Sequence, residues 1–90
     1  MVYMITYDLC SPGQNYDKVD QAIQNASSGK WIKFCESAYL IKSYLSADQI
    51  VAQIKSNFDK NDRLLVAEIT KNYQGLLTSD DWKYIRESLF

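Results

Sequence analysis

The chain has 90 residues and a mass of 10.4 kDa, which is enough for one small domain and too little for two separate hydrophobic cores. Apolar residues make up 47% of it and charged residues 23%, a mixture typical of globular proteins and unlike that of disordered chains. A net charge of -1 excludes the strongly cationic surface of a dedicated nucleic-acid binder, while local basic patches remain compatible with it. The absence of histidine excludes Ser-His and Cys-His catalysis and His-ligated zinc, so any catalysis must depend on carboxylates, Lys, Tyr, Ser or a hard metal ion.

Two features of the sequence bear on its compartment. Cys10 and Cys35 are too few for a disulfide framework and lie in apolar stretches, so we expect reduced, buried thiols. The N-terminus lacks a positively charged region and reaches Asp8, unlike a secretory signal, and no apolar run approaches the ~20 residues of a membrane span. These features predict a cytoplasmic protein with no membrane partner.

The first third of the chain predicts a strand and a helix. Residues 2–9 are rich in β-branched and aromatic types, which is typical of a strand buried on both faces. Residues 11–15 contain the only proline and favour a turn, with Asn15 suited to the N-cap of a helix. The helix begins at Tyr16 and ends before Gly29. Its apolar residues recur at helical spacing at Tyr16, Val19, Ile23 and Ala26.

The following residues predict two more strands, a second helix and a fourth strand. Residues 30–45 contain no Gly or Pro, and the polar pair at 36–37 is the best place for a bend between two strands. Residues 46–49 match a capping box and open a helix with one apolar face. After a charged turn, residues 63–70 form a mostly apolar strand.

This order of elements is β-α-β-β-α-β, the order of the ferredoxin-like plait. In that α+β fold, two helices cover one face of a four-stranded antiparallel sheet. Right-handed crossovers make the first and third strands the central pair. We therefore expect a ferredoxin-like domain over residues 1–77, including an extended segment, a C-terminal strand, after the fourth strand. Residues 78–90 form a C-terminal helical appendage, with a capped start and Trp82, Ile85 and Leu89 in line.

Asp8 is the strongest candidate for chemistry. It ends an otherwise apolar central strand, so its side chain is expected at the rim of the sheet. One interpretation is an Asx turn that only begins the following loop. The other is a catalytic metal ligand. Because Mg²⁺ needs several oxygen ligands, that interpretation requires Asp8 to meet a second copy of itself across a two-fold axis. Two such carboxylates could hold Mg²⁺ or Mn²⁺ for phosphodiester hydrolysis.

Basic and aromatic residues in the predicted strands are candidates for nucleic-acid binding. Lys33 and Lys42 are cations at strand positions, although no run of cations forms a phosphate track. Tyr39 belongs to a set of strand aromatics that could stack on bases or could simply pack in the core.

Three segments together carry a resemblance to a known family. They are VYMITYDL with the following SPGQNYDK turn, the segment from Trp31 to Tyr39 with its Glu-Ser-Ala-Tyr end, and DRLLVAEIT from Asp62. Over roughly residues 1–77 the chain resembles small SinR-like proteins of bacteria and mobile elements. More distantly it resembles the Cas-two family of CRISPR adaptation.

The resemblance implies a homodimer in which the segment after the fourth strand, with Tyr73 and Leu76, pairs with the other subunit's sheet. It also implies that Asp8 is the ligand of a divalent metal between subunits, for cleavage of RNA or DNA. A different class of function is a non-enzymatic protein of a phage or mobile element that sequesters a nucleotide or blocks a host defence protein. A third is an interaction module that uses Trp82 and Phe90 of the C-terminal helix as anchors.

Overall fold

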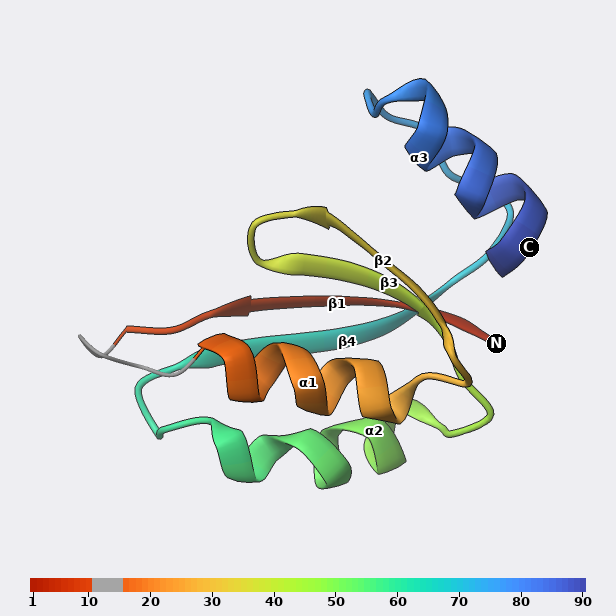
Figure 1. The fold of residues 1–90 in the computed structure, drawn as a ribbon. Coiled ribbons are helices and arrows are strands. Elements are labelled where there is room, and N and C mark those ends of the chain that lie inside the picture. The colour runs from red at the N-terminus through yellow and green to blue at the C-terminus, as the bar shows by residue number, and fades with distance from the viewer. Residues whose placement is uncertain (11–15) are drawn as a thin grey trace.

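The computed structural model describes residues 1–10 and 16–90, and its course is drawn in Figure 1. The strands are β1 (Val2–Asp8), β2 (Lys30–Cys35), β3 (Ala38–Lys42) and β4 (Arg63–Ile69). The α-helices are α1 (Tyr16–Ala26), α2 (Ala47–Ile54) and α3 (Ser79–Tyr84). The 3₁₀ turn η1 (Lys55–Asn57) follows α2, and the π-helical turn η2 (Ile85–Leu89) continues α3.

The four strands form one antiparallel sheet in the order β2-β3-β1-β4. The small α+β class with a four-stranded antiparallel sheet is therefore confirmed, and β1 and β3 are the central strands, as predicted. Residue Ile5 of β1 lies between Tyr39 of β3 and Val66 of β4, which fixes the register.

One face of the sheet and the helices α1 and α2 enclose the main core (Figure 1). Side chains alternate between the two faces of a strand, and Tyr3, Ile5 and Tyr7 of β1 point to this side. They meet helix residues at the predicted spacing, among them Val19 and Ile23, which are fully buried. In α2, the predicted capping box is confirmed: Ser46 Oγ accepts from the Gln49 N–H at 3.2 Å, and the Ser46 N–H donates to Gln49 Oε1 at 2.9 Å. We call the opposite side of the sheet the open face.

A second apolar cluster lies on the open face, where the C-terminal residues pack. Ile85 and Leu89 are each 1% exposed and meet Val2 and Leu40 of the sheet. The predicted start of the helix is confirmed, because Thr78 Oγ1 accepts from the Asp81 N–H at 3.1 Å. Residues 78–90 are thus packed against the sheet and supply half of its second core.

The structure differs from the sequence-based expectations at the two cysteines and after the fourth strand. Both Cys10 and Cys35 are free and exposed, so the expectation of buried thiols is wrong: Cys10 lies beyond the end of β1, and Cys35 ends an edge strand. No strand forms after Ile69, because residues 70–77 cross the open face and pack side chains on it. The expected N-cap at Asn15 lies outside the described residues.

Candidate functional site

Asp8 lies at the predicted rim of the sheet. It is the last residue of β1 and is exposed. By alternation from Val2 and Met4, which pack in the second cluster, its side chain is on the open face. Its carboxylate makes no hydrogen bond or ion pair with any described residue. Among residues 1–10 and 16–90, nothing therefore competes with a ligand for this carboxylate.

Arg63 stands directly opposite Asp8 on β4. One guanidinium nitrogen, Nη1, donates to the main-chain carbonyls of Asn61 at 3.2 Å and Asp62 at 3.1 Å. These bonds hold the side chain beside the strand end and leave further N–H donors for an anion. Asp8 and Arg63 line a shallow hollow together with Thr6, Tyr7, Leu64 and Leu65.

Asp62 fixes the backbone around this pair. Its Oδ1 accepts from the Cys10 N–H at 2.9 Å, and its Oδ2 accepts from the Asp59 N–H at 2.8 Å. One largely buried carboxylate thus joins the exit of β1 to the loop that enters β4. The relative position of Asp8 and Arg63 is set by main-chain bonds rather than by contact between their own side chains.

A single chain does not provide a complete metal site here. Within the described residues there is no group of three or more acidic or Cys side chains that could hold an ion. Mg²⁺ takes six oxygen ligands, some of them water. One carboxylate provides too few protein ligands for this ion, and the neighbouring positive charge of the arginine disfavours a second cation. The residues present fit a divalent ion only when a second copy contributes its own Asp8.

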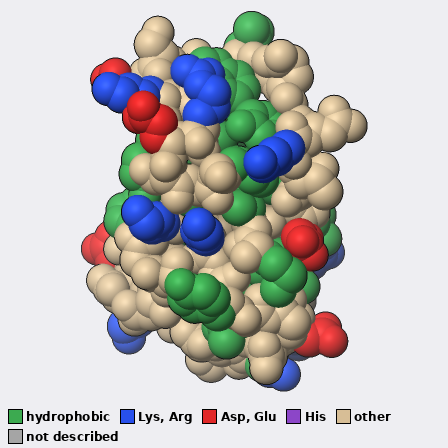
Figure 2. All heavy atoms as spheres, turned by 90° about the vertical axis from the view of Figure 1, so that its right-hand side faces the viewer, with side chains coloured by type: hydrophobic (Ala, Val, Ile, Leu, Met, Phe, Trp, Pro, Cys, Tyr) green, Lys and Arg blue, Asp and Glu red, His purple; other side chains and the backbone are tan. Residues whose placement is uncertain are grey.

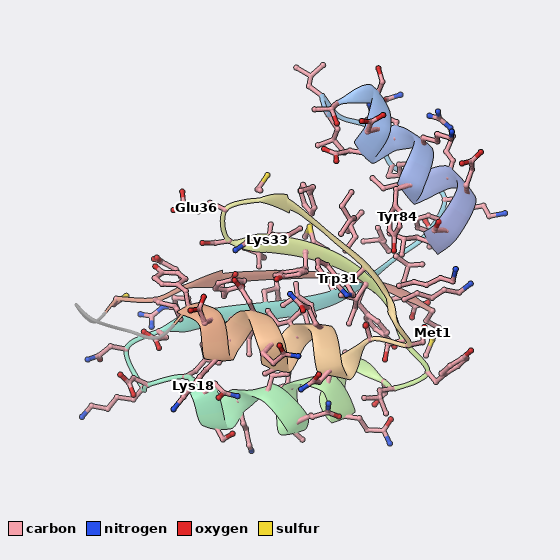
Figure 3. All side chains as sticks on the ribbon, in the orientation of Figure 1. Met1, Lys18, Trp31, Lys33, Glu36 and Tyr84 are labelled. Carbon is pink, nitrogen blue, oxygen red and sulfur yellow. The ribbon has the colours of Figure 1, made fainter. Side chains whose placement is uncertain are left out.

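Lys33 and Tyr39 belong to a polar network on the opposite face of the sheet. Asp20 of α1 accepts from the Tyr7 hydroxyl at 2.6 Å and from Lys33 Nζ at 3.1 Å. Lys33 Nζ also lies 5.8 Å from the centre of the Tyr39 ring, whose hydroxyl accepts from Gln24 at 3.1 Å. Figure 3 shows Lys33 pointing toward α1. Tyr39 is 1% exposed, so its ring is not accessible to a base in this structure.

The network raises the pKa of its phenols. Burial raises the pKa of Tyr7 far above its ordinary value of 10.0, and the hydrogen bond to the Asp20 carboxylate adds to the effect, because both disfavour a phenolate. The pKa of Tyr39 is also raised, mainly by burial. Both phenols therefore stay protonated at neutral pH and do not act as bases.

Lys42 lies on the open face, at the end remote from Asp8. It faces Lys30 across the β2–β3 pair and Val2 across the β3–β1 pair. Lys71 follows β4 by two residues at the same end, since Ile69 also faces Val2. Figure 2 looks onto this end of the molecule and shows several Lys and Arg side chains there. The predicted cations Lys33 and Lys42 are thus on opposite faces, and only Lys42 shares the face of Asp8.

The two residues expected at a dimer contact have different surroundings. Tyr73 is packed within its own chain, stacked on Trp82 at 6.1 Å and on Phe90 at 5.0 Å between ring centres. The same stacking occupies the two aromatic side chains considered as anchors for a partner. Leu76 is 99% exposed and free to meet another molecule.

Leu76 borders an apolar groove of about 380 Å³ between the open face and residues 73–82. Neither this groove nor the position of Arg63 opposite Asp8 was predicted from the sequence. A sequence signal for the groove was the pair of apolar residues Val2 and Met4 at even-numbered positions of β1, which face away from the helices. The Arg63 position required the register of β1 with β4, which the sequence does not reveal.

The sequence was also compared with known proteins. No model of a protein family matches the chain, and no curated protein matches it. The resemblance to SinR-like and Cas-two proteins therefore stays a prediction. No helix in the described part of the chain is long and apolar enough to cross a membrane.

Proposed function

We propose that this protein is a Cas-two-like homodimer that cleaves RNA or DNA with a divalent metal ion, Mg²⁺ or Mn²⁺, held by the Asp8 residues of two copies. The proposal takes the architecture to be the ferredoxin-like plait, which the β-α-β-β-α-β order and central β1 and β3 support. The observation that carries it is the Asp8 carboxylate, exposed at the end of a central strand and without a partner among the described residues.

The surroundings of Asp8 favour phosphate chemistry over a purely structural role. An aspartate that begins an Asx turn accepts the main-chain N–H two residues further on, and in this protein that N–H, of Cys10, donates to Asp62 instead. Among the described residues, Asp8 stands opposite Arg63, whose planar guanidinium binds phosphate oxygens well. A carboxylate for a metal and a cation for a phosphate are the two charges that phosphodiester cleavage requires here.

A second copy completes the site. The part of the open face near Asp8 also carries Leu65, which is 56% exposed, and Leu76 is exposed on the segment that crosses this face. A contact with a second copy on this face would remove both leucine side chains from water. Asp8 of each copy would hold the ion and Arg63 would bind the phosphate, and the ion, when bound, would supply an activated water at neutral pH.

The test is a cleavage assay with matched variants. Wild-type protein is incubated with single-stranded RNA and DNA in Mg²⁺, Mn²⁺ or EDTA, and compared with Asp8→Asn and with Asp48→Asn, which changes another exposed acid. We expect metal-dependent cleavage by the wild type and by Asp48→Asn, and only the metal-free background with Asp8→Asn. Arg63→Ala should weaken substrate binding by about 10-fold, as expected for one lost charge-assisted hydrogen bond.

Cleavage retained by Asp8→Asn would contradict the proposal. So would the absence of cleavage by the wild type across these metals and substrates. Tight binding of a nucleotide without turnover would then favour the alternative, a non-enzymatic protein that sequesters a nucleotide.

A further inference from the structure

We propose that the apolar groove on the open face receives an unpaired base of single-stranded nucleic acid whose backbone runs along β1 to Asp8 and Arg63. The inference rests on the proposed function, because it names the part of the substrate that the protein holds beside the cleavage site. It adds a binding subsite built by the C-terminal residues, at a distance from the two charged groups.

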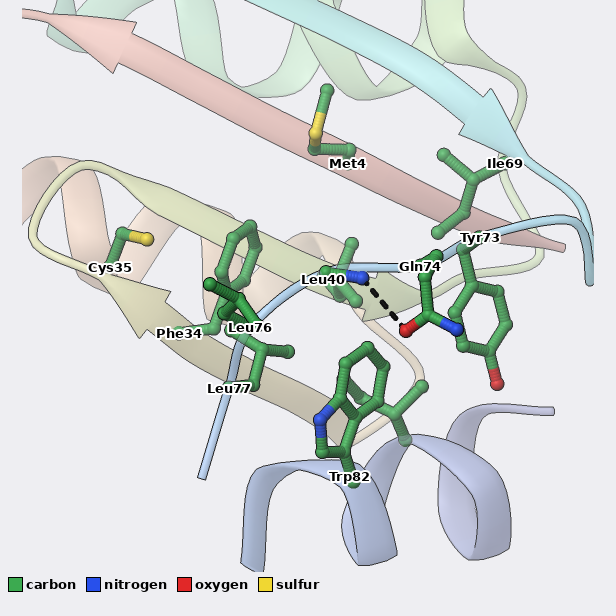
Figure 4. A pocket seen from close by; sticks show the side chains of 12 residues that line it. Met4, Phe34, Cys35, Leu40, Ile69, Tyr73, Gln74, Leu76, Leu77 and Trp82 are labelled. Carbon is green, nitrogen blue, oxygen red and sulfur yellow. Dashed lines mark hydrogen bonds between the residues drawn. The ribbon is translucent and has the colours of Figure 1, made fainter. Parts of the chain in front are cut away.

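The groove has the size and lining of a small-molecule site. Its volume of about 380 Å³ lies within the ~300–1,000 Å³ typical of ligand pockets. It lies between β1, β2 and β3 on one side and the C-terminal segment on the other (Figure 4). Its lining is Met4, Phe34, Cys35, Leu40, Ile69, Tyr73, Gln74, Gly75, Leu76, Leu77, Trp82 and Ile85.

The lining has two properties that suit a nucleobase. Phe34 and Trp82 are only partly buried and border the space. Trp82 is already stacked on Tyr73 on one side, so the Phe34 ring and the remaining surface of Trp82 are the flat apolar surfaces on which a base can stack. Gln74 is the one amide side chain in the lining. Its Oε1 accepts from the Gly75 N–H at 3.0 Å, the bond drawn in Figure 4. The amide nitrogen has no partner among the described residues and can donate to acceptors on a base edge.

The groove is continuous with the charged site along one strand. Met4 lines the groove, and Thr6 and Asp8 follow on the same face of β1. With about 3.4 Å per residue, Met4 and Asp8 are ~14 Å apart along the strand. A few nucleotides of single strand cover that distance, so one molecule can reach both places.

Charges on the open face are complementary to such a strand. Lys42 and Lys30 lie at the end where β1 begins, Arg63 lies at the other end, and the apolar groove is between them. Phosphates can therefore meet cations on both sides of a buried base. Because a base inside a duplex cannot leave its stack without cost, this arrangement favours single strands.

The test uses Trp82 as a reporter. The variant Asp8→Asn/Trp31→Phe does not cleave, and Trp82 is its only tryptophan, because the chain has two. Without metal, it is titrated with a short single-stranded RNA, with the duplex of the same sequence and with an abasic ribose-phosphate strand of the same length. We expect the single strand to quench Trp82 fluorescence saturably. The abasic strand should bind at least about 10-fold more weakly, because it lacks the affinity that one stacked base contributes. Gln74 is exposed, and the substitution Gln74→Ala should weaken binding of the single strand severalfold.

A control variant separates stacking from a general change in structure. Asp8→Asn/Trp82→Phe keeps only Trp31, which packs against the main core on the other face, and its emission should stay constant. Equal quenching by the duplex or the abasic strand, an equal response of Trp31, or no response at all would overturn the proposal. Cleavage by the wild type with no quenching of Trp82 would contradict base binding in the groove and leave the proposed nuclease function standing. Quenching of Trp82 without cleavage by the wild type would support base binding in the groove and contradict the nuclease function.

Discussion

At the scale of single residues, Asp20 makes side-chain contacts on the helix-covered face. It joins the Tyr7 hydroxyl of β1 and the Lys33 ammonium of β2 to helix α1. Tyr7 is 4% exposed, so water has little access to replace this bond. Lys33 is partly exposed, and its share of the pair is screened by solvent.

This difference predicts unequal effects of substitution. Asp20→Ala leaves the buried Tyr7 hydroxyl without an acceptor and should cost about 1–3 kcal/mol of unfolding free energy, measured by urea denaturation. Lys33→Ala removes only a half-exposed partner and should cost about 0–1 kcal/mol. Glu36→Ala, at an exposed turn acid, is the control, and an effect there as large as that of Asp20→Ala would contradict the account.

The raised pKa of Tyr7 predicts a pH dependence of stability. In the unfolded chain the phenol titrates near its ordinary pKa of 10.0, whereas in the folded protein its pKa is higher. The resulting stabilisation is complete below pH 10 and is lost as the pH rises toward the folded-state pKa. Urea midpoints should therefore fall above pH 10, and less steeply in Tyr7→Phe. Identical alkaline profiles for the two proteins would refute this assignment.

At the scale of elements, the C-terminal helix acts as the cover of the second core. The hydroxyl of Tyr84 accepts from the main-chain N–H of Trp31 at 3.0 Å, which ties the helix to edge strand β2 (Figure 3). This bond occupies an N–H on a strand edge that could otherwise pair with another chain. The helix therefore protects the sheet as well as burying apolar side chains.

Two leucines near the C-terminus provide a matched comparison. Leu89→Ala removes a side chain that is 1% exposed and should cost about 2–5 kcal/mol. Leu76→Ala changes a side chain that is 99% exposed and should shift unfolding free energy by less than ~0.5 kcal/mol. Urea denaturation at a concentration where the protein is monomeric measures both, and equal losses would contradict the observed packing.

The elements themselves were largely predictable from the sequence. The spacing of Val19, Ile23 and Ala26 and the capping box at Ser46 are local signals, and both helices form where these indicate. The path of residues 70–77 was not predictable, because it depends on Tyr73 stacking between Trp82 and Phe90 across the open face. Such contacts join segments that only the finished fold brings together.

At the scale of the whole molecule, the two faces of the sheet differ in what covers them and in the residues that they expose. Helices α1 and α2 and the tyrosines seal one face, while the open face carries the groove, Arg63 and Asp8. The position of Asp8 at the rim was predictable, since it ends an apolar strand. Its neighbours were not, because strand register and the position of Arg63 depend on pairing between distant segments.

The exposure of the two thiols also depends on their place in the fold and not on their neighbours in the sequence. An apolar neighbourhood in sequence indicated buried Cys10 and Cys35, but a position beyond a strand end or on an edge strand exposes a side chain whatever its neighbours are. Local composition therefore predicts burial well for the central strands and poorly at the borders of the sheet.

Native mass spectrometry with Mn²⁺ tests the central claim most directly, because it counts chains and ions together. We predict a species of twice the 10.4 kDa chain mass carrying one Mn²⁺ per two chains, and loss of that ion in Asp8→Asn while the dimer remains. A protein that stays a 10.4 kDa monomer, or an Asp8→Asn dimer that keeps the ion, would contradict the paired Asp8 site.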